Sequence, residues 1–200
     1  MRYLILGATG TLGRATVKAL LSDDATESIL CLSRDELKQF EMKKHFGDER
    51  LSFAIADIRD KEAIREYFTG IDTCFHFAAL KRIPEMERHP MESLKTNVLG
   101  AVNAAECAHS AGIKNFIFSS TDKACLPINT YGACKFLAEQ FMLHMQEKSD
   151  TNFSVYRWGN VVGSRGSAVH EFKKSLIESG TATLTDDRMS RFWILSLIHI

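Results

Sequence analysis

The sequence predicts an α/β fold in which helices cover both faces of a doubly wound parallel sheet. Three observations lead to this prediction. Short, almost continuous apolar runs alternate with amphipathic stretches, and the first run leads into glycines spaced G-x-x-G-x-x-G. The composition, 45% hydrophobic and 25% charged, is that of an ordinary globular domain. Strands buried on both faces and joined by right-handed helical crossovers produce this pattern.

Six apolar runs are predicted as strands, and five amphipathic segments are predicted as helices. The strands are "YLILG", "SILCLSR", "LSFAIAD", "IDTCFHFAA", "NFIFSS" and "FSVYRWGN"; the helices cover residues 11–22, 35–45, 60–68, 91–110 and 130–147. No internal repeat, low-complexity tract or linker rich in proline and glycine divides the sequence. We therefore expect a single α/β core.

Charge and cysteine content exclude several classes of partner. The sequence has 25 basic and 25 acidic side chains, so no overall field favours nucleic acid or a membrane surface. Its five cysteines include no C-x-x-C, and its seven histidines show no metal-ligand spacing. The N-terminal apolar run is too short for a signal peptide. We expect a cytoplasmic protein without a bound metal.

The glycines after the first strand predict a phosphate-binding turn. Gly7, Gly10 and Gly13 open the first predicted helix, where backbone N–H groups can surround a pyrophosphate at the positive end of the helix dipole. A plain turn between a strand and a helix is the alternative. We expect the cofactor to contact Gly7, Thr9, Gly10, Thr11, Leu12 and Gly13.

The ends of the second and third strands predict how the adenosine part of a dinucleotide is recognised. Ser33 and Arg34 stand where a carboxylate would bind a ribose 2′-hydroxyl, and Lys38 follows one turn later. These cations favour a 2′-phosphate, and hence NADP over NAD. The alternative is a helix start at "RDE", in which the acids only cap the helix. Asp57 and Ile58 are expected beside the adenine, although such an aspartate can also be a helix cap.

A Tyr-x-x-x-Lys pattern on the fifth predicted helix indicates redox chemistry. Tyr131 and Lys135 project from one face of that helix because they are four residues apart. A nearby ammonium would lower the pKa of the tyrosine from about 10, so that a phenolate could take a hydroxyl proton. The segment 119–135 also holds the charged triplet Thr121, Asp122 and Lys123, which hydride transfer alone does not require.

These motifs together resemble the extended short-chain dehydrogenase/reductase superfamily, which has a Rossmann-like fold. More narrowly, the sequence resembles the inverting UDP-N-acetylglucosamine 4,6-dehydratases (5-epimerising) of bacterial surface-sugar and polysaccharide biosynthesis. The matching segments are "SRDELK", "HFAALKRIPEMERHP", "KTNVLGAVN", "SSTDKA", "INTYGACK", "RWGNVVGSRGS" and "TDDRMSRFW". The resemblance covers nearly the whole sequence.

The resemblance implies a lyase reaction that explains the triplet. Such enzymes oxidise C4 of the sugar, eliminate water across C5 and C6, and return the hydride to C6. By similarity, Lys123 is the C5 base, Asp122 is the acid toward the C6 oxygen, and Thr121 bonds the C4 oxygen. The alternative is that Asp122 and Lys123 only pair on a surface loop. Their position after a parallel strand, where α/β sheets bind ligands, favours a functional role.

Further site residues follow only from the resemblance. The cofactor is expected to contact Ala78, Ala79, Val161, Val162, Gly163, Ser164 and Arg165 as well as Tyr131 and Lys135. The UDP-sugar substrate is expected to contact Lys81, Asn160, Thr185 and Arg188, although each of these could instead be a plain turn or surface residue. The resemblance also implies a homo-oligomer.

The domain prediction combines the motifs with the resemblance. Residues 1–165 are expected to form the NADP-binding domain, with the catalytic segment 119–135. Residues 166–200 are expected to begin a substrate-binding region that is truncated here and has an atypical tail over 194–200. Two other functions are compatible with the motifs: a UDP-hexose 4-epimerase, which has no need of Asp122 and Lys123, and a non-catalytic NADP-binding regulator.

Overall fold

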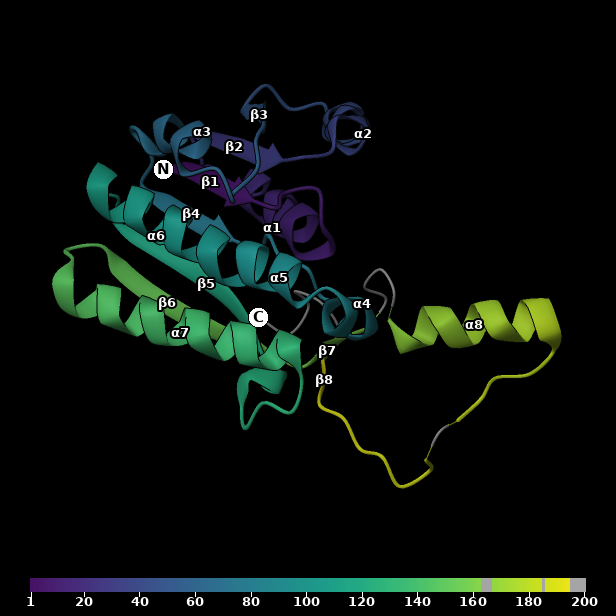
Figure 1. Cartoon of the computed structure of the whole chain (residues 1–200). Helices are drawn as coiled ribbons and strands as arrows, with labels where there is room; N and C mark the ends of the chain where they lie inside the picture. Colours follow the sequence, from purple (N-terminus) through teal and green to yellow (C-terminus); the bar gives the residue numbers. More distant parts are fainter. Residues whose placement is uncertain (163–166, 185, 195–200) are drawn as a thin grey trace. The chain divides into compact units, whose positions relative to one another are not determined.

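The computed structural model of the chain describes residues 1–162, 167–184 and 186–194. The chain divides into two compact units, Met1–Arg157 and Trp158–Ile200. The first unit contains the large sheet and most of the helices (Figure 1). It is the unit that carries the Gly-rich turn and the segment 119–135.

The first unit is built on a six-stranded sheet with the order β3-β2-β1-β4-β5-β6. The strands are β1 (Arg2–Leu6), β2 (Ser28–Ser33), β3 (Leu51–Ile55), β4 (Thr73–His76), β5 (Asn115–Thr121) and β6 (Asn152–Trp158). Pairing is parallel for β1 with β2 and β4, for β2 with β3, and for β4 with β5. The strand order therefore reverses beside β1, and the carboxyl ends of β1 and β4 meet where such sheets bind ligands. The predicted α/β, Rossmann-like, doubly wound parallel sheet is confirmed.

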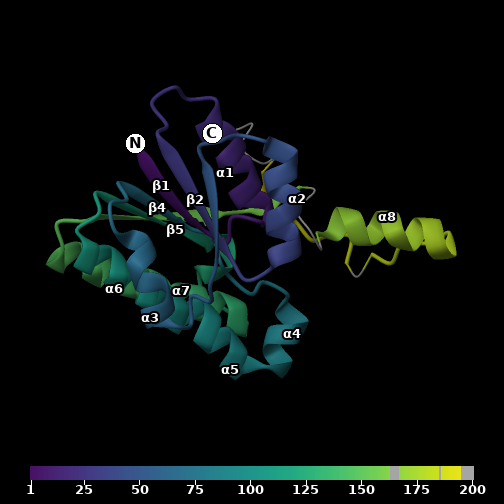
Figure 2. The ribbon, with the colours of Figure 1, turned by 90° about the horizontal axis from the view of Figure 1, so that it is seen from above.

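Alternating side chains of the central strands enter two separate cores. Leu4 and Leu6 of β1 lie in one hydrophobic cluster, and Tyr3 and Ile5 lie in the other. This period of two is what a strand buried on both faces requires. In Figure 2, α1 and α2 lie on one side of the sheet, and α3, α6 and α7 lie on the other.

Four predicted helices match observed ones closely. These are α1 (Thr11–Leu21), α2 (Glu36–Phe46), α3 (Lys61–Arg65) with the 3₁₀ turn η1 (Glu66–Phe68), and α7 (Thr130–Lys148). Asp35, Asp60 and Asn129 accept a backbone N–H at the starts of α2, α3 and α7. Such caps satisfy donors that have no partner within the helix.

The predicted helix 91–110 is interrupted in the structure. It consists of α5 (Pro90–Ser93), a π-helical stretch η2 (Leu94–Leu99) and α6 (Gly100–Ala111). A further helix, α4 (Ile83–Arg88), lies in a segment that was not predicted as helical. Proline stands at the N-terminal turn of both α4 and α5, where its missing N–H is harmless.

The described part of the second unit contains a short parallel pair, β7 (Asn160–Val161) and β8 (Trp193–Ile194), and the helix α8 (Ala168–Ser179). Asn160 N–H donates to Phe192 O at 2.7 Å, and Val162 N–H donates to Ile194 O at 3.0 Å. A Cβ on Gly159 would lie 2.7 Å from Phe192 O, so this close pairing needs glycine there.

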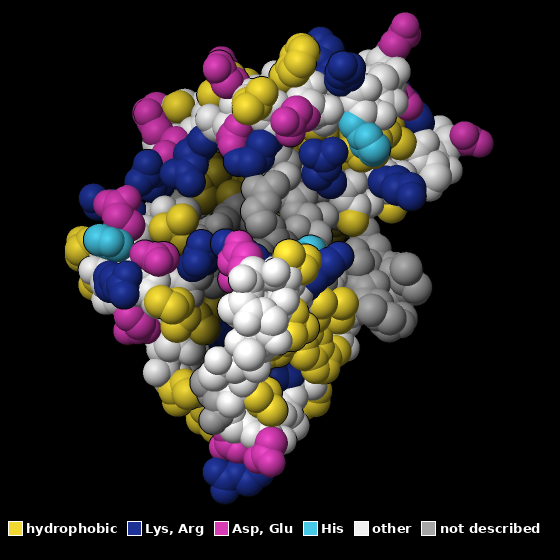
Figure 3. All heavy atoms as spheres, turned by 90° about the vertical axis from the view of Figure 1, so that its right-hand side faces the viewer, with side chains coloured by type: hydrophobic (Ala, Val, Ile, Leu, Met, Phe, Trp, Pro, Cys, Tyr) yellow, Lys and Arg dark blue, Asp and Glu magenta, His cyan; other side chains and the backbone are white. Residues whose placement is uncertain are grey.

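Among the helices that the structure describes, none combines the length and the apolar character needed to cross a membrane. On the face that Figure 3 shows, acidic and basic side chains are interspersed. The whole sequence has 25 basic and 25 acidic side chains, which is consistent with this mixed surface.

Candidate active site

The turn between β1 and α1 is shaped by its glycines. Gly7 has φ of +84°, and its N–H donates to Leu32 O at 2.8 Å. A Cβ on Gly7 would lie 2.7 Å from the backbone nitrogen of Ala78, and a Cβ on Gly13 would lie 2.4 Å from Ala8 O. Helix α1 starts without a side-chain cap and without an acid in its first turn. An anion could therefore approach the backbone N–H groups at the start of α1 without meeting a competing carboxylate.

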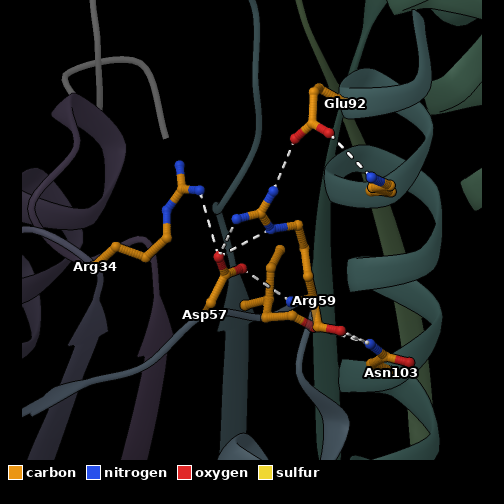
Figure 4. A network of polar contacts seen from close by, with 7 residues as sticks. Arg34, Asp57, Arg59, Glu92 and Asn103 are labelled. Atoms are coloured by element: carbon orange, nitrogen blue, oxygen red, sulfur yellow. Dashed lines mark hydrogen bonds and ion pairs between the residues drawn. The ribbon is translucent and has the colours of Figure 1, made fainter.

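At the ends of β2 and β3, one carboxylate lies between two guanidinium groups (Figure 4). Asp57 accepts from Arg59 Nη2 at 2.6 Å and Nε at 2.9 Å, and Arg34 Nη1 lies 3.5 Å from the same Asp57 oxygen. Burial raises the pKa of Asp57, but hydrogen bonds from Arg59 and the charges of both arginines outweigh it, so the pKa is lowered. Asp57 therefore stays ionised and holds Arg34 next to the predicted adenosine site.

The other predicted residues at this end of the sheet also have partners within the chain. Lys38 forms an ion pair with Asp35, which caps α2. Ser33 Oγ accepts from Gln39 Nε2 at 3.0 Å. The cap at Asp35 agrees with the alternative of a helix start at "RDE". It is also compatible with phosphate binding by Arg34 and Lys38, because both side chains are partly exposed.

The loop after β4 is held by a buried asparagine that the sequence analysis missed. Asn97, in the π-helical stretch, accepts from Leu80 N–H and donates to Leu80 O, both at 2.8 Å. The predicted cofactor residues Ala78 and Ala79 precede this anchor, and the predicted substrate residue Lys81 follows it on the exposed side. Asn97 therefore fixes the backbone that would carry these contacts.

The triplet after β5 forms a compact polar cluster. Asp122 Oδ1 accepts from Thr121 Oγ1 at 3.0 Å and from Lys123 Nζ at 2.9 Å. Partial burial raises the pKa of Asp122, but the hydrogen bonds from Lys123 and Thr121 outweigh burial, so the pKa is lowered. Both side chains of the pair remain partly accessible, with 26% and 30% of their surface exposed. A reactant could therefore reach them.

Glycine brings this cluster next to the tyrosine. A Cβ on Gly132 would lie only 2.1 Å from the carbonyl oxygen of Lys123, so α7 can approach the 3₁₀ turn η3 (Asp122–Ala124) this closely only with glycine there. Asn129 Oδ1 accepts from Gly132 N–H at 2.8 Å and fixes the start of α7. Tyr131 precedes Gly132 in the chain, and both Thr121 and Asp122 influence the pKa of its phenol. The triplet and the Tyr-x-x-x-Lys pair therefore share one site.

Lys135 is buried in the same region. Only 2% of it is exposed, its Nζ donates to Ser119 O at 2.7 Å, and this nitrogen lies 4.4 Å from the centre of the Phe118 ring. Burial lowers the pKa of Lys135 to about 8, against the opposing influence of Glu139 and Cys134. The amine can therefore change its protonation state within about one pH unit of neutrality.

The expected lowering of the tyrosine pKa is wrong for the protein without ligands. Burial raises the pKa of Tyr131 to about 12, the Asp122 carboxylate adds to the rise, and the hydrogen bond with Thr121 opposes it. The lysine amine bonds Ser119 O instead of supplying a charge that dominates at the phenol. Tyr131 is therefore a neutral phenol in this arrangement.

Several other predicted residues belong to the second unit or lie outside the described residues. Asn160 and Val161 form β7, and Val162 follows it. Arg188 is exposed and donates to Asp186 through Nε at 3.0 Å and Nη2 at 2.9 Å. Gly163, Ser164, Arg165 and Thr185 lie outside the residues that the structure describes.

Sequence comparison gives the chain a family. The model of the family described as "Polysaccharide biosynthesis protein" matches residues 3–197. A "UDP-N-acetylglucosamine 4,6-dehydratase (inverting)" of Campylobacter jejuni subsp. jejuni serotype O:23/36 (strain 81-176) is 45% identical over 196 residues, which are 96% of this chain and 58% of that protein. A "UDP-glucose 4-epimerase" of Rickettsia felis is 38% identical over 201 residues, which are 98% of this chain and 59% of that protein.

Structural comparison agrees with this result. The X-ray structure of Pen from Bacillus thuringiensis has a TM-score of 0.92 and 34% sequence identity, and the match covers 96% of this chain and 62% of that chain. The chain spans just under three fifths of the length of the curated relatives it matches. With a family match over nearly its whole length, the chain belongs to the polysaccharide biosynthesis protein family.

Proposed function

We propose that this chain carries the cofactor-binding and catalytic part of an NADP-dependent UDP-N-acetylglucosamine 4,6-dehydratase (inverting), a hydro-lyase of bacterial surface-sugar synthesis. The observation that carries the proposal is the shared site of Thr121, Asp122, Lys123 and Tyr131 at the end of β5. The identity of 45% to a relative named for this activity supports it. We further propose that the protein is a cytoplasmic homo-oligomer.

The turn between β1 and α1 fits a nicotinamide dinucleotide. Its glycines allow the backbone to pack more closely than a Cβ would permit, and the uncapped start of α1 offers backbone N–H groups to a pyrophosphate. Arg34, held by Asp57, would bind the adenosine 2′-phosphate together with Lys38. The bound dinucleotide supplies the acceptor for hydride from C4 and the donor of hydride to C6.

Tyr131 would take the proton of the C4 hydroxyl. Its phenol is neutral in the unliganded site, so the group must lose its own proton before it can act as the base. Lys135, four residues after Tyr131, lies on the same face of α7. In the ammonium form it would stabilise the Tyr131 phenolate once the substrate has excluded water. Thr121 would form a hydrogen bond with the C4 hydroxyl group.

Lys123 and Asp122 would carry out the elimination. Their resting state is an ion pair, in which Lys123 holds the proton that Asp122 needs. Transfer of that proton across the 2.9 Å contact would give a neutral amine and a carboxylic acid. The amine would then take the C5 proton, the acid would protonate the departing C6 hydroxyl, and water would leave. Exclusion of water by the substrate favours this neutral form of the pair.

The triplet is tested by replacing Lys123 in a protein that contains this chain and turns over UDP-N-acetylglucosamine. Lys123→Ala should still permit oxidation at C4, so reduced cofactor should accumulate while deuterium at C5 is retained. Lys148→Ala, on the exposed end of α7, is the matched control and should release that deuterium as the unsubstituted protein does. Loss of cofactor reduction in a folded Lys123→Ala protein would remove Lys123 from the C5 role.

Product analysis separates this function from epimerisation, which the relative named "UDP-glucose 4-epimerase" makes the second candidate. A 4-epimerase would invert C4 of its substrate and retain the C6 hydroxyl. Release of water and a C6 methyl group in the product would support the dehydratase. A C4 epimer with its C6 hydroxyl intact would replace our proposal with the epimerase.

The cofactor preference is tested by titrating the chain with NADP and with NAD. We expect tighter binding of NADP, and we expect Arg34→Ala to weaken NADP binding about tenfold while leaving NAD binding nearly unchanged, because a charge-assisted hydrogen bond contributes about 1.5 kcal/mol or more. Arg65→Ala, which removes an exposed arginine of α3, is the control. Equal affinities for both cofactors in the unsubstituted chain would show that Arg34 and Lys38 only begin a helix.

The contacts with the UDP-sugar are proposed from the resemblance alone. They are Lys81, Asn160, Thr185 and Arg188. Val161, Val162, Gly163, Ser164 and Arg165 would flank the nicotinamide. These assignments depend on the resemblance of "RWGNVVGSRGS" and "TDDRMSRFW" to the family.

A further inference from the structure

An ion pair between a buried carboxylate and a partly exposed guanidinium lies one helical turn beyond Lys135. Glu139 of α7 is 4% exposed, and Arg157 of β6 donates to its carboxylate through Nε at 3.0 and 3.2 Å and through Nη2 at 2.6 Å. This two-point contact suits a planar guanidinium and a carboxylate. A buried carboxylate needs such a partner, because an uncompensated charge in a protein interior is strongly destabilising.

The helix places this pair next to the lysine. Tyr131, Lys135 and Glu139 follow each other at intervals of four, so their side chains occupy successive turns of one face of α7. Lys135 and Glu139 are both almost completely buried, at 2% and 4% exposed. Electrostatic attraction between such groups is much stronger than between exposed ones.

The surroundings of Lys135 contain few other charged groups. On β5, Lys135 contacts the Ser119 carbonyl and the Phe118 ring. On β4 its neighbour is His76, and the pKa of His76 is lowered to about 3 by burial and by the charge of Lys135. On its own helix, Cys134 and Glu139 both act to raise the pKa of Lys135. Because His76 is neutral, Glu139 is the carboxylate among these recorded neighbours, and its effect on the pKa of Lys135 is larger than that of Cys134.

We propose that Glu139, held in place by Arg157, is a positioning residue that keeps Lys135 in the ammonium form at neutral pH. The carboxylate offsets part of the burial that favours the neutral amine. This inference deepens the proposed function, in which Lys135 has to be cationic to stabilise the Tyr131 phenolate. Glu139 itself touches neither substrate nor cofactor, so its effect passes entirely through Lys135.

The direct test is the titration of the Lys135 side chain by nuclear magnetic resonance in the labelled chain, with Lys135→Met used to assign the signal. In Glu139→Gln the titration midpoint should fall by about one pH unit, the shift that loss of a nearby opposite charge produces. Glu147→Gln removes an exposed carboxylate two turns further along the same helix and should leave the midpoint unchanged. Glu139→Asp keeps the charge and should recover at least part of the shift.

A second variant protects the test against misfolding. If Glu139→Gln alone unfolds the chain, the double change of Glu139→Gln with Arg157→Leu removes both members of the pair, which is often tolerated. The midpoint should fall in this variant as well. An unchanged Lys135 midpoint in either folded variant would overturn the proposal and leave the pair as a packing contact.

The titration also separates this inference from the proposed function. A lowered midpoint in a chain that binds no dinucleotide would support the role of Glu139 and reject the cofactor site. In a protein with dehydratase activity, Glu139→Gln should move the alkaline limb of the pH–rate profile to lower pH, because the ammonium form is lost earlier. A profile that keeps its limb while overall activity drops would contradict the proposal.

Discussion

The individual residues around the end of β5 are unusual because several polar side chains are buried there. Thr121, Ser120 and Lys135 are at most 5% exposed, and His76 is completely buried. Lys135 and Thr121 have hydrogen-bond partners, whereas neither ring nitrogen of His76 has one of good geometry among the described residues. Its ring lies between Phe116 and Phe118, with centroid distances of 6.0 and 5.4 Å. His76 is therefore a neutral imidazole inside an aromatic layer.

His76 should make the stability of the chain depend on pH. Burial, followed by the charge of Lys135, lowers the pKa of His76 from 6.5 to about 3. Between pH 6.5 and pH 3 the histidine is therefore protonated in the unfolded state and neutral in the folded state. The free energy of unfolding should therefore fall by about 1 kcal/mol for each pH unit below 6.5, until pH approaches 3.

The contribution of His76 can be isolated by comparing the unfolding of the unsubstituted chain with that of His76→Leu between pH 4 and 7. The variant cannot bind the proton, so its free energy of unfolding should decline less steeply toward acid pH. His45→Leu, which removes an exposed histidine of α2, should leave the slope unchanged. Equal slopes for His76→Leu and the unsubstituted chain would show that His76 is protonated in the folded state.

At the level of the elements, glycines inside helices decide how closely neighbouring segments approach. Gly132 lets α7 contact the backbone of η3, and Gly100 lets α6 contact the side chain of Ile58. Asn103 of α6 also donates to Ile58 O at 3.0 Å and to Arg59 O at 3.2 Å, which anchors the loop after β3 (Figure 4). The two helices thereby position the two ends of the candidate site.

Gly132→Ala and Gly100→Ala form a matched pair for testing this role. Alanine in a helix is normally more stable than glycine by up to about 1 kcal/mol. At Gly132 the new Cβ would lie 2.1 Å from a backbone oxygen, so η3 must move, and we expect a loss of about 1 to 3 kcal/mol. At Gly100 the nearest atom, at 2.7 Å, is the Cδ1 end of a flexible isoleucine, and we expect a smaller loss.

Chemical denaturation measures both effects. Gly132→Ala should also abolish any activity that depends on Lys123 and Tyr131 together, whereas Gly100→Ala should act mainly on cofactor affinity through Ile58. A Gly132→Ala chain as stable as the unsubstituted one would mean that α7 and η3 lie further apart than the structure shows.

At the scale of the whole molecule, the hydrophobic core that the described residues form lies in the first unit. Both clusters of buried residues, one on each face of the sheet, have all their members between Tyr3 and Phe153. The second unit, in its described part, has a helix without any buried residue. Stability of the fold should therefore come from the first unit, because burial of apolar surface is the main favourable contribution to folding.

A fragment of residues 1–158, which keeps all of β6, should fold without the rest of the chain. We expect a single cooperative unfolding transition and binding of NADP through the turn between β1 and α1. Circular dichroism during thermal unfolding and a cofactor titration would measure both. A fragment without a cooperative transition would show that residues after 158 are needed to complete the core.

Much of the fold was predictable because its signals lie in neighbouring residues. Apolar runs identified all six strands of the large sheet, and the caps Asp35 and Asn129 mark helix starts in the sequence itself. The predicted helix over 91–110 did not anticipate the π-helical stretch. A single π-helical turn differs from an α-helix in its backbone hydrogen bonds, and the pattern of apolar residues does not reveal that difference. Helix α4 was missed because Pro84 resembles a loop residue unless it stands in a first helical turn.

For the candidate site, the sequence by itself determined the chemical groups: the Gly-rich turn, the triplet and the Tyr-x-x-x-Lys pair, each a local pattern. Tertiary structure alone decided the contacts between distant residues, such as Asn97 with Leu80 and Glu139 with Arg157, which are 17 and 18 positions apart. It also decided the protonation of Tyr131 and Lys135, because burial raises one pKa and lowers the other. Burial depends on how whole elements pack, and no short stretch of sequence contains that information.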